Sequence, residues 1–312
     1  MRKGHCQMLN VLSVDVEDYF HVEAFAGTIR YEQWDSYERR VERNVERILE
    51  LFAKYKVKGT FFILGWVAEK LPHLSRRIAI DGHEIGCHGY AHRRIQTLTP
   101  EEFREDLKRA TGLLTDQVQR RVQCYRAPSF SVVMSTMWSL DVLVDEGYTI
   151  DSSIFPVHHD LYGIPRAERF PHWQTSPAGQ PIFEFPPSTI RKANNNFGVA
   201  GGGYLRLIPY GPTRWAIQHI NEVEGQPVMV YFHPWEMDPD QPIVPAGIRS
   251  TLRHYTNLSS MAKKIERLLQ DFQFTTLSDA SQQCPKYQLQ PSRSPEELQK
   301  PASVNIKTAR YI

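Results

Sequence analysis

The feature that most constrains the fold is an alternation of short apolar runs, rich in β-branched and aromatic residues, with longer amphipathic segments. The apolar runs cover residues 10–15, 59–64, 83–87, 122–125, 148–150, 227–232 and 274–277. Helical patterns cover 37–55, 67–80, 134–146, 212–223 and 259–271, and the capping box that begins at Thr99 predicts a further helix from Pro100. Such alternation is typical of an α/β fold with a mainly parallel sheet. We expect a distorted (β/α) barrel of about seven strands, a size within the range of single α/β barrels.

Two segments depart from this alternation. Residues 151–210 carry many Pro, Gly and Asn residues, which predicts long loop insertions within the domain. Beyond Cys284, prolines recur at 285, 291, 295 and 301 without apolar periodicity. The expected organisation is one domain over residues 1–283, followed by a loosely attached tail over residues 284–312.

Composition excludes several classes of protein. Lys and Arg number 37 against 35 Asp and Glu, a formal net charge of +2, which argues against a nucleic-acid binder held by phosphate neutralisation. No run approaches the roughly 18 apolar residues of a transmembrane helix. The N-terminus shows no signal-peptide pattern, and Cys6, Cys87, Cys124 and Cys284 show no disulfide-scaffold spacing, so we expect a cytoplasmic protein. No oligomeric state follows from the sequence.

Acidic residues end the first apolar run. Asp15, Glu17 and Asp18 follow one another closely there, and carboxylates gathered at the end of a buried strand repel one another unless a cation lies between them. The plainer alternative is that they cap the following loop.

Two histidines, His88 and His92, follow the third apolar run, with Gly86 two residues before the first and Gly89 directly after it. Glycine permits a turn that would bring both imidazoles to one point, and imidazole nitrogens suit zinc, cobalt or nickel. Two unrelated surface histidines are the alternative.

Arg126 and His233 also lie where apolar runs end. An arginine there can hold a carboxylate, and a histidine can act as general acid or base. A structural ion pair and a packed core histidine are the respective alternatives.

In this order the four motifs resemble the polysaccharide deacetylases of the NodB type, carbohydrate esterase family 4, over about residues 9–280 of the chain. The segments 159–165, 201–206, 232–236 and 253–258 resemble the branch that is associated with exopolysaccharide and exosortase gene clusters.

The resemblance implies roles for particular residues. Asp15 matches the catalytic base, His88 and His92 the metal-binding histidines, Arg126 the arginine that holds the base, and His233 the general acid. The family's usual pair of adjacent aspartates is missing, which leaves Glu17 and Asp18 as candidates for the third metal ligand. Strand alternation favours Glu17, which shares a side with Asp15. The metal expected is Zn²⁺, with Co²⁺ or Ni²⁺ as alternatives.

Further residues are expected to contact the sugar or stabilise the oxyanion. Asp151 is a candidate for conformation or sugar contact, with loop capping as its alternative, and the backbone N–H near Ala127 or Ser129 for the oxyanion. Aromatic rings on loops are candidates for stacking on sugar faces, with plain packing as the alternative. The candidates for substrate binding are Pro128, Ser129, Asp151, Tyr204 and Trp235, with Trp173 as a further stacking ring.

The expected activity is removal of N-acetyl groups from N-acetylhexosamine units of a polysaccharide or its lipid-linked precursor. Exopolysaccharide biosynthesis is the expected setting, in the cytoplasm or at the inner membrane face. Two alternatives remain: hydrolysis of another C–N amide bond, in a cyclic amide or ureide, and a glycan-binding relative without catalysis.

Overall fold

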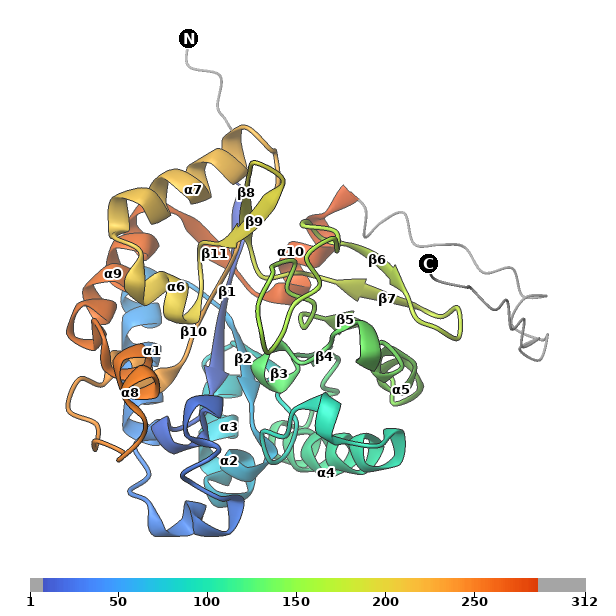
Figure 1. The fold of residues 1–312 in the computed structure, drawn as a ribbon, viewed down its shortest axis with the longest axis vertical. Coiled ribbons are helices and arrows are strands. Elements are labelled where there is room, and N and C mark those ends of the chain that lie inside the picture. Colours follow the sequence, from blue (N-terminus) through green and yellow to red (C-terminus); the bar gives the residue numbers. More distant parts are fainter. Residues whose placement is uncertain (1–7, 286–312) are drawn as a thin grey trace.

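A nine-stranded sheet forms the centre of the protein, with helices around it (Figure 1). The computed structural model describes residues 8–285. Its strands run in the order β10-β1-β2-β3-β4-β5-β7-β6, with β11 beside the start of β1. All neighbours along the seven strands from β10 to β7 are parallel, which confirms the predicted α/β fold. The strands are β1 (Leu9–Val16), β2 (Thr60–Ile63), β3 (Glu84–Cys87), β4 (Cys124–Tyr125), β5 (Ile150–Asp151), β6 (His172–Thr175), β7 (Pro181–Glu184), β10 (Met229–Phe232) and β11 (Gln273–Thr275).

The two ends of the strand order do not meet. Within residues 8–285, β10 and β6 form no ladder, so the pairings describe an open, barrel-like sheet. On the outer side of β10, an isolated parallel bridge joins Gly201 to Tyr231. A Cβ at Gly201 would lie 1.9 Å from the Tyr231 ring, so this close approach requires glycine.

Ten α-helices accompany the sheet in the described residues. They are α1 (Val41–Tyr55), α2 (Gly65–Lys70), α3 (Pro72–Ile80), α4 (Pro100–Val118), α5 (Ser139–Asp145), α6 (Gly202–Leu207), α7 (Tyr210–Glu222), α8 (Ile248–Tyr255), α9 (Leu258–Asp271) and α10 (Leu277–Gln283). The helix predicted over 67–80 is two helices, because Leu71, just before Pro72, adopts an extended φ of −134°. Helix α8 was not predicted from the sequence, because its amphipathic pattern is short and follows prolines and a glycine.

The start of α4 shows how sequence sets an element's boundary. The Thr99 hydroxyl accepts a hydrogen bond from the Glu102 N–H (3.2 Å), and the Glu102 carboxylate accepts one from the Thr99 N–H (2.8 Å). This reciprocal pair satisfies two otherwise free donors, and Pro100 needs no donor partner. The predicted capping box is confirmed.

The prediction of loops over residues 151–210 is wrong in part. Strand β7 joins the sheet beside β5, and β6 pairs with it antiparallel. Two further strands, β8 (Thr189–Lys192) and β9 (Asn195–Gly198), form a separate hairpin. Its turn residues Ala193 and Asn194 have φ of 48° and 63°, the left-handed values that such hairpin turns require. Strands of four residues between prolines and asparagines give too short a pattern to recognise.

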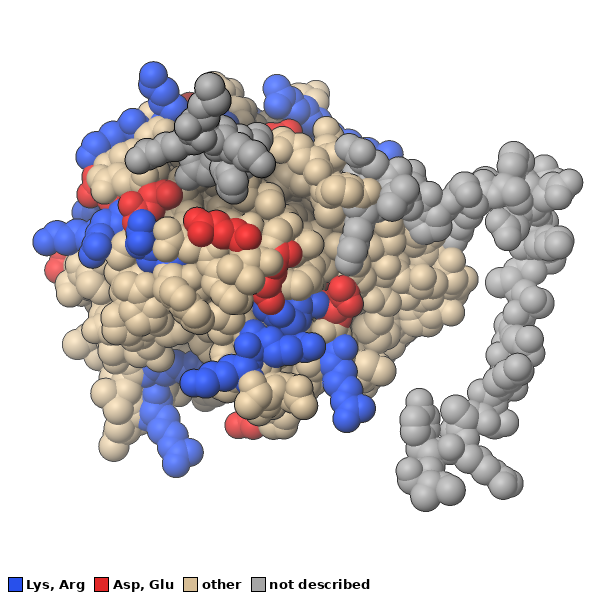
Figure 2. Space-filling view, turned by 90° about the horizontal axis from the view of Figure 1, so that it is seen from above, with Lys and Arg blue, Asp and Glu red and all other residues tan. Residues whose placement is uncertain are grey.

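On the face that Figure 2 shows, no broad area carries charges of one sign only. Acidic and basic side chains are interspersed there among uncharged ones. In the described part of the chain, no helix is both long and apolar enough to span a bilayer. Cys87, Cys124 and Cys284 are buried and free, and burial raises the pKa of Cys87 to about 11. Cys284, at the start of the predicted tail, packs in the core, while Cys6 and residues 286–312 lie outside the described residues.

Candidate active site and metal centre

The candidate site lies in a cavity of about 540 Å³ at the carboxyl ends of the parallel strands. Asp15 and Glu17 come from the end of β1, His88 and His92 from the loop after β3, and His233 directly follows β10. Parallel strands bring their carboxyl ends to one edge of the sheet, which is why residues up to 218 positions apart meet here. The five side chains line one cavity, as the sequence analysis expected of residues at strand ends.

Glu17, His88 and His92 form a compact cluster. One ligand atom from each lies within 4.8 Å of the others. The Glu17 Oε2 atom is buried without a hydrogen bond, and it lies 3.2 Å from His92 Nε2. Burial would raise the pKa of Glu17, but the charges of His92 and His233 outweigh it and hold the pKa below its usual range. The carboxyl group is therefore ionised.

The imidazole of His88 has a fixed tautomer. Its Nδ1 atom donates a hydrogen bond to the Arg126 carbonyl oxygen at 2.8 Å, so the Nε2 atom carries the free lone pair. Burial lowers the pKa of His88 to about 4, which keeps the ring neutral at pH 7. A neutral ring with one nitrogen held by a carbonyl is the state that metal ligation requires.

The backbone conformation brings the His92 side chain close to His88. Gly89 has φ of 69° and His92 has φ of 51°, so the chain turns twice within four residues. The half-buried Asp106 carboxylate, from α4, accepts a hydrogen bond from the Tyr90 N–H at 2.7 Å and holds this turn. The ring centroids of the two histidines are 5.6 Å apart as a result.

This donor set fits a divalent metal. Two imidazole nitrogens and one ionised carboxylate oxygen converge, and one of the oxygens is buried with no hydrogen bond. Zinc takes such ligands at about 2.0–2.2 Å, and catalytic sites use three protein ligands with open positions left over. The residues present therefore suit the metal that the sequence analysis expected.

Asp18 is not part of the cluster. Its carboxylate accepts hydrogen bonds from the N–H groups of Tyr19 (3.0 Å), Arg40 (2.6 Å) and Val41 (2.9 Å). Burial raises the pKa of Asp18 to about 6, against the effect of these donors. Because the carboxylate is committed to the backbone where α1 begins, the candidate role of Asp18 as a metal ligand is wrong. The loop-capping alternative holds for this acid.

Asp15 pairs with Arg126 beneath the cluster. Arg126 Nη1 lies 2.6 Å from Asp15 Oδ1 and also donates to the Ser13 hydroxyl at 2.9 Å. Its Nη2 atom donates to the Ser152 hydroxyl at 3.1 Å, and the whole guanidinium is buried. The arginine therefore fixes the carboxylate in place, while the second oxygen, Oδ2, lies 3.9 Å from His233 Nε2.

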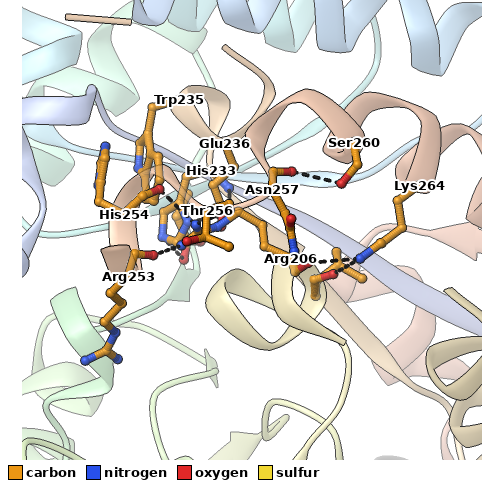
Figure 3. A network of polar contacts seen from close by, with 12 residues as sticks. Arg206, His233, Trp235, Glu236, Arg253, His254, Thr256, Asn257, Ser260 and Lys264 are labelled. Atoms are coloured by element: carbon orange, nitrogen blue, oxygen red, sulfur yellow. Dashed lines mark hydrogen bonds and ion pairs between the residues drawn. The ribbon is translucent and has the colours of Figure 1, made fainter. Parts of the chain in front are cut away.

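His233 is held between two carboxylates, those of Glu17 and Glu236, and Figure 3 shows Glu236 beside it. Its Nε2 atom lies 3.0 Å from Glu17 Oε1, and its Nδ1 atom lies 2.9 Å from Glu236 Oε2. Arg206 Nε holds the other Glu236 oxygen at 2.6 Å. Burial alone would lower the pKa of His233, but the charges of Glu17 and Glu236 raise it to about 10. The ring is protonated at neutral pH, as a general acid must be.

The candidates for sugar contact divide into two groups. Ser129, Tyr204 and Trp235 line the cavity. Three others do not line the cavity, so the geometry does not support their expected substrate contact. Pro128 packs against Gly89, Trp173 packs on Phe183, and Asp151 is fully buried beside Glu184.

One of the two backbone donors proposed for the oxyanion is already occupied. The Ala127 N–H donates to the Ser153 hydroxyl at 2.8 Å. Ser129 has a left-handed φ of 54° and lines the cavity, and within residues 8–285 its N–H has no hydrogen-bond acceptor. Ser129 is therefore the remaining candidate.

Sequence reasoning missed the residues that support the site. Glu236 lies three residues after His233, a spacing that could have suggested it. Arg206 and Asp106 act from other helices, and no local pattern marks them.

Two family models match this chain, one over its first half and one over its second half. Residues 33–149 match the family model described as polysaccharide deacetylase, and this segment contains His88, His92 and Arg126. Residues 152–282, which contain His233, match a model described as a domain of unknown function, DUF3473.

Curated relatives match parts of the chain. A peptidoglycan-N-acetylglucosamine deacetylase from Bacillus cereus is 37% identical over 84 residues, 27% of this chain and 28% of the relative. A chitooligosaccharide deacetylase from Rhizobium leguminosarum bv. trifolii is 25% identical over 115 residues, 37% of this chain and 49% of the relative. The chain thus spans less than half the length of either relative.

The fold itself has a solved counterpart. The crystal structure of a Mycobacterium smegmatis protein assigned to the polysaccharide deacetylases superposes with a TM-score of 0.61 at 17% identity, covering 94% of this chain and 96% of that one. At this identity the likeness concerns the fold alone. The match over residues 33–149, which hold both histidines and the arginine of the site, identifies this part of the chain as a member of the polysaccharide deacetylase family.

Proposed function

We propose that this protein is a metal-dependent hydrolase that removes N-acetyl groups from N-acetylhexosamine units of a polysaccharide or its lipid-linked precursor. The observation that carries the proposal is one cavity that joins a two-His, one-Glu cluster to an Asp–Arg pair and a protonated histidine. The names of the relatives, which are deacetylases of peptidoglycan and chitooligosaccharide, support this substrate class.

Glu17, His88 and His92 would hold the metal. A divalent ion there supplies Lewis acidity, which polarises the acetamide carbonyl and favours attack by water. The neutral His88 ring and the ionised Glu17 carboxylate are already in the protonation states that ligation needs.

Asp15 would act as general base. Its carboxylate, held by Arg126, accepts a proton from the attacking water, whose oxygen bonds to the carbonyl carbon of the acetamide. The Ser129 N–H would donate to the carbonyl oxygen as negative charge develops on it. Fixing the base through a buried arginine spares reorganisation during the reaction.

His233 would act as general acid. The C–N bond breaks as the His233 Nε2 proton passes to the leaving nitrogen, which gives acetate and a free amine on the sugar. Glu236, anchored by Arg206, keeps the Nδ1 atom protonated and orients the ring, so the Nε2 atom faces the reacting bond.

The setting belongs to the proposal as well. The resemblance of segments 201–206 and 232–236 to the exopolysaccharide-associated branch favours exopolysaccharide biosynthesis, in the cytoplasm or at the inner membrane face. Finding the mature protein outside the cytoplasm would contradict that location.

The test is release of acetate from acetylated chito-oligosaccharides and from peptidoglycan fragments. We expect Asp15→Asn and His233→Ala to lower kcat by about 10²–10⁴-fold, the usual contribution of a positioned acid or base. His73→Ala, at an exposed histidine on α3, is the matched control and keeps full activity. Wild-type activity in Asp15→Asn, or turnover of hydantoin-like rings without acetate release, contradicts the proposal.

The metal is tested by its content as well as by activity. Purified protein is expected to hold a divalent ion that dialysis against a chelator removes, with loss of activity and recovery on addition of zinc. His88→Ala and His92→Ala should each lower the zinc content measured by mass spectrometry. Activity that survives complete removal of metal would overturn the metal role.

A further inference from the structure

The rim of the cavity carries an unusual set of exposed aliphatic side chains. Ile248 and Leu252, one turn apart on α8, are 80% and 63% exposed, and Ile243 just before the helix is 78% exposed. Leu207, at the end of α6, is also exposed and lines the cavity. Large aliphatic residues are usually buried, and several together at one place indicate an interaction surface.

Hydrogen bonds link the segments that carry Ile243 and Leu207 to helix α8, which carries Ile248 and Leu252. The Val244 N–H, next to Ile243, donates to the Tyr255 hydroxyl at 2.8 Å, which ties that segment to α8. Arg206, next to Leu207, donates to the backbone carbonyl oxygens where α8 ends. We call Leu207, Ile243, Ile248 and Leu252 the rim patch.

Helix α8 is firmly held with this side outward. Arg206 binds the carbonyl oxygens of Arg253 (2.9 Å), His254 (2.8 Å) and Thr256 (3.1 Å), as Figure 3 shows. On the inner side, the His254 ring stacks on Trp235 with centroids 4.1 Å apart. The exposure of Ile248 and Leu252 therefore does not come from a loosely attached helix.

Positive charge borders the rim patch. Arg249 and Arg253 each follow an aliphatic residue of α8, so they form the next stripe around the helix, and both line the mouth of the cavity. Neither guanidinium makes an ion pair within residues 8–285. Glu23, an acid of the cavity lining, is neutralised by Arg94 at 3.2 Å. The mouth thus has uncompensated positive charge beside an aliphatic stripe.

We infer that the rim patch docks on an anionic membrane surface, with its aliphatic side chains in the headgroup boundary and Arg249 and Arg253 against lipid phosphates. Apolar side chains flanked by basic ones are the pattern of interfacial helices. Docking in this way turns the cavity mouth toward the headgroups, where a glycan carried on a lipid would reach the site. Only that last consequence rests on the proposed function.

The test is co-sedimentation of the full chain with vesicles, in the absence of glycan. We expect binding to phosphatidylcholine vesicles that contain phosphatidylglycerol, and weaker binding when phosphatidylglycerol is left out or salt is raised. Ile248→Asp and Leu252→Asp should each lower the partition coefficient at least about tenfold. Arg249→Gln with Arg253→Gln should remove the preference for the anionic lipid.

Ile80→Asp is the matched control, because Ile80 on α3 is equally exposed, at 80%, and lies outside the rim patch. Equal loss of vesicle binding in Ile80→Asp, or no binding by the wild type, overturns the inference. So does self-association without vesicles that Ile248→Asp abolishes, which would make the rim patch an interface between copies. Acetate release from soluble oligosaccharide is expected to be unchanged in Ile248→Asp, so a failure of docking and a failure of the proposed function are distinguishable.

Discussion

Replacing Glu184 by glutamine should make the protein less sensitive to alkaline pH. Asp151 and Glu184 are direct neighbours across β5 and β7, and both carboxyl groups are fully buried. Asp151 Oδ2 and Glu184 Oε2 are each buried without a hydrogen-bond partner, so two negative charges there would be costly, and we expect the pair to share one proton. Burial and the charge of Asp151 raise the pKa of Glu184 well above its usual value, and burial raises the pKa of Asp151 to about 6.

The size of the effect follows from proton linkage. A raised pKa gives stability that is fully present below the pKa of the unfolded chain and is lost as pH rises through the folded pKa. Between pH 6 and the folded pKa of Glu184, the folded state holds about one more proton than the unfolded state. The free energy of unfolding then falls by about 1.4 kcal/mol per pH unit from this pair. The Glu184→Gln amide donates to Asp151 without a titratable proton, so this loss disappears.

The assay is urea unfolding of the wild type and Glu184→Gln at pH 6, 7 and 8. The difference between the two free energies of unfolding should move in favour of Glu184→Gln by about 1.4 kcal/mol per pH unit. Glu266→Gln, at a surface acid paired with Lys54, is the control and should show no such trend. Parallel pH profiles for the wild type and Glu184→Gln would refute the shared proton.

Three other substitutions test the helix cap at Thr99, the buried ion pair of Arg206 and the close packing at Gly201. Thr99→Ala should destabilise the protein by about 1 kcal/mol in urea unfolding, through loss of the α4 cap, whereas Thr99→Ser should be near neutral. Arg206→Met removes the arginine that binds the buried Glu236 carboxylate and three backbone carbonyl oxygens where α8 ends, and it should cost about 3–5 kcal/mol by the same measurement; a loss under 1 kcal/mol would contradict this anchoring role. Gly201→Ala should lower the thermal midpoint sharply, because the new methyl group would meet the Tyr231 ring, while Gly203→Ala, whose nearest neighbour is 4.0 Å away, should not.

The site combines charges that would be unfavourable apart. Asp15, Glu17 and Glu236 are buried carboxylates, and each is offset by a partner: Asp15 by Arg126, Glu17 by His92 and His233, and Glu236 by Arg206. Removing one member leaves its partner as an unpaired buried charge, which costs more than the pair contributes. Loss of activity in these variants is therefore to be read together with their stability.

Much of the fold follows from local patterns. The apolar runs at 10–15, 59–64 and 227–232 became β1, β2 and β10, because buried parallel strands need continuous apolar residues. The cap at Thr99 fixed the start of α4, because its hydrogen bonds close within four residues. The hairpin β8–β9 and helix α8 could not be recognised, since their short patterns are interrupted by residues typical of turns.

The sequence by itself also determined which residue types stand at the strand ends, and hence that Asp15, His88, His92, Arg126 and His233 would gather at one edge of the sheet. Only the tertiary structure decided between neighbours such as Glu17 and Asp18. Strand β1 ends at Val16, and the Asp18 carboxylate accepts hydrogen bonds from two N–H groups at the start of α1 and from the N–H of Tyr19. Likewise, contacts over 30 residues of chain join Arg206 to Glu236. Such choices depend on distances between separate elements, which no local pattern encodes.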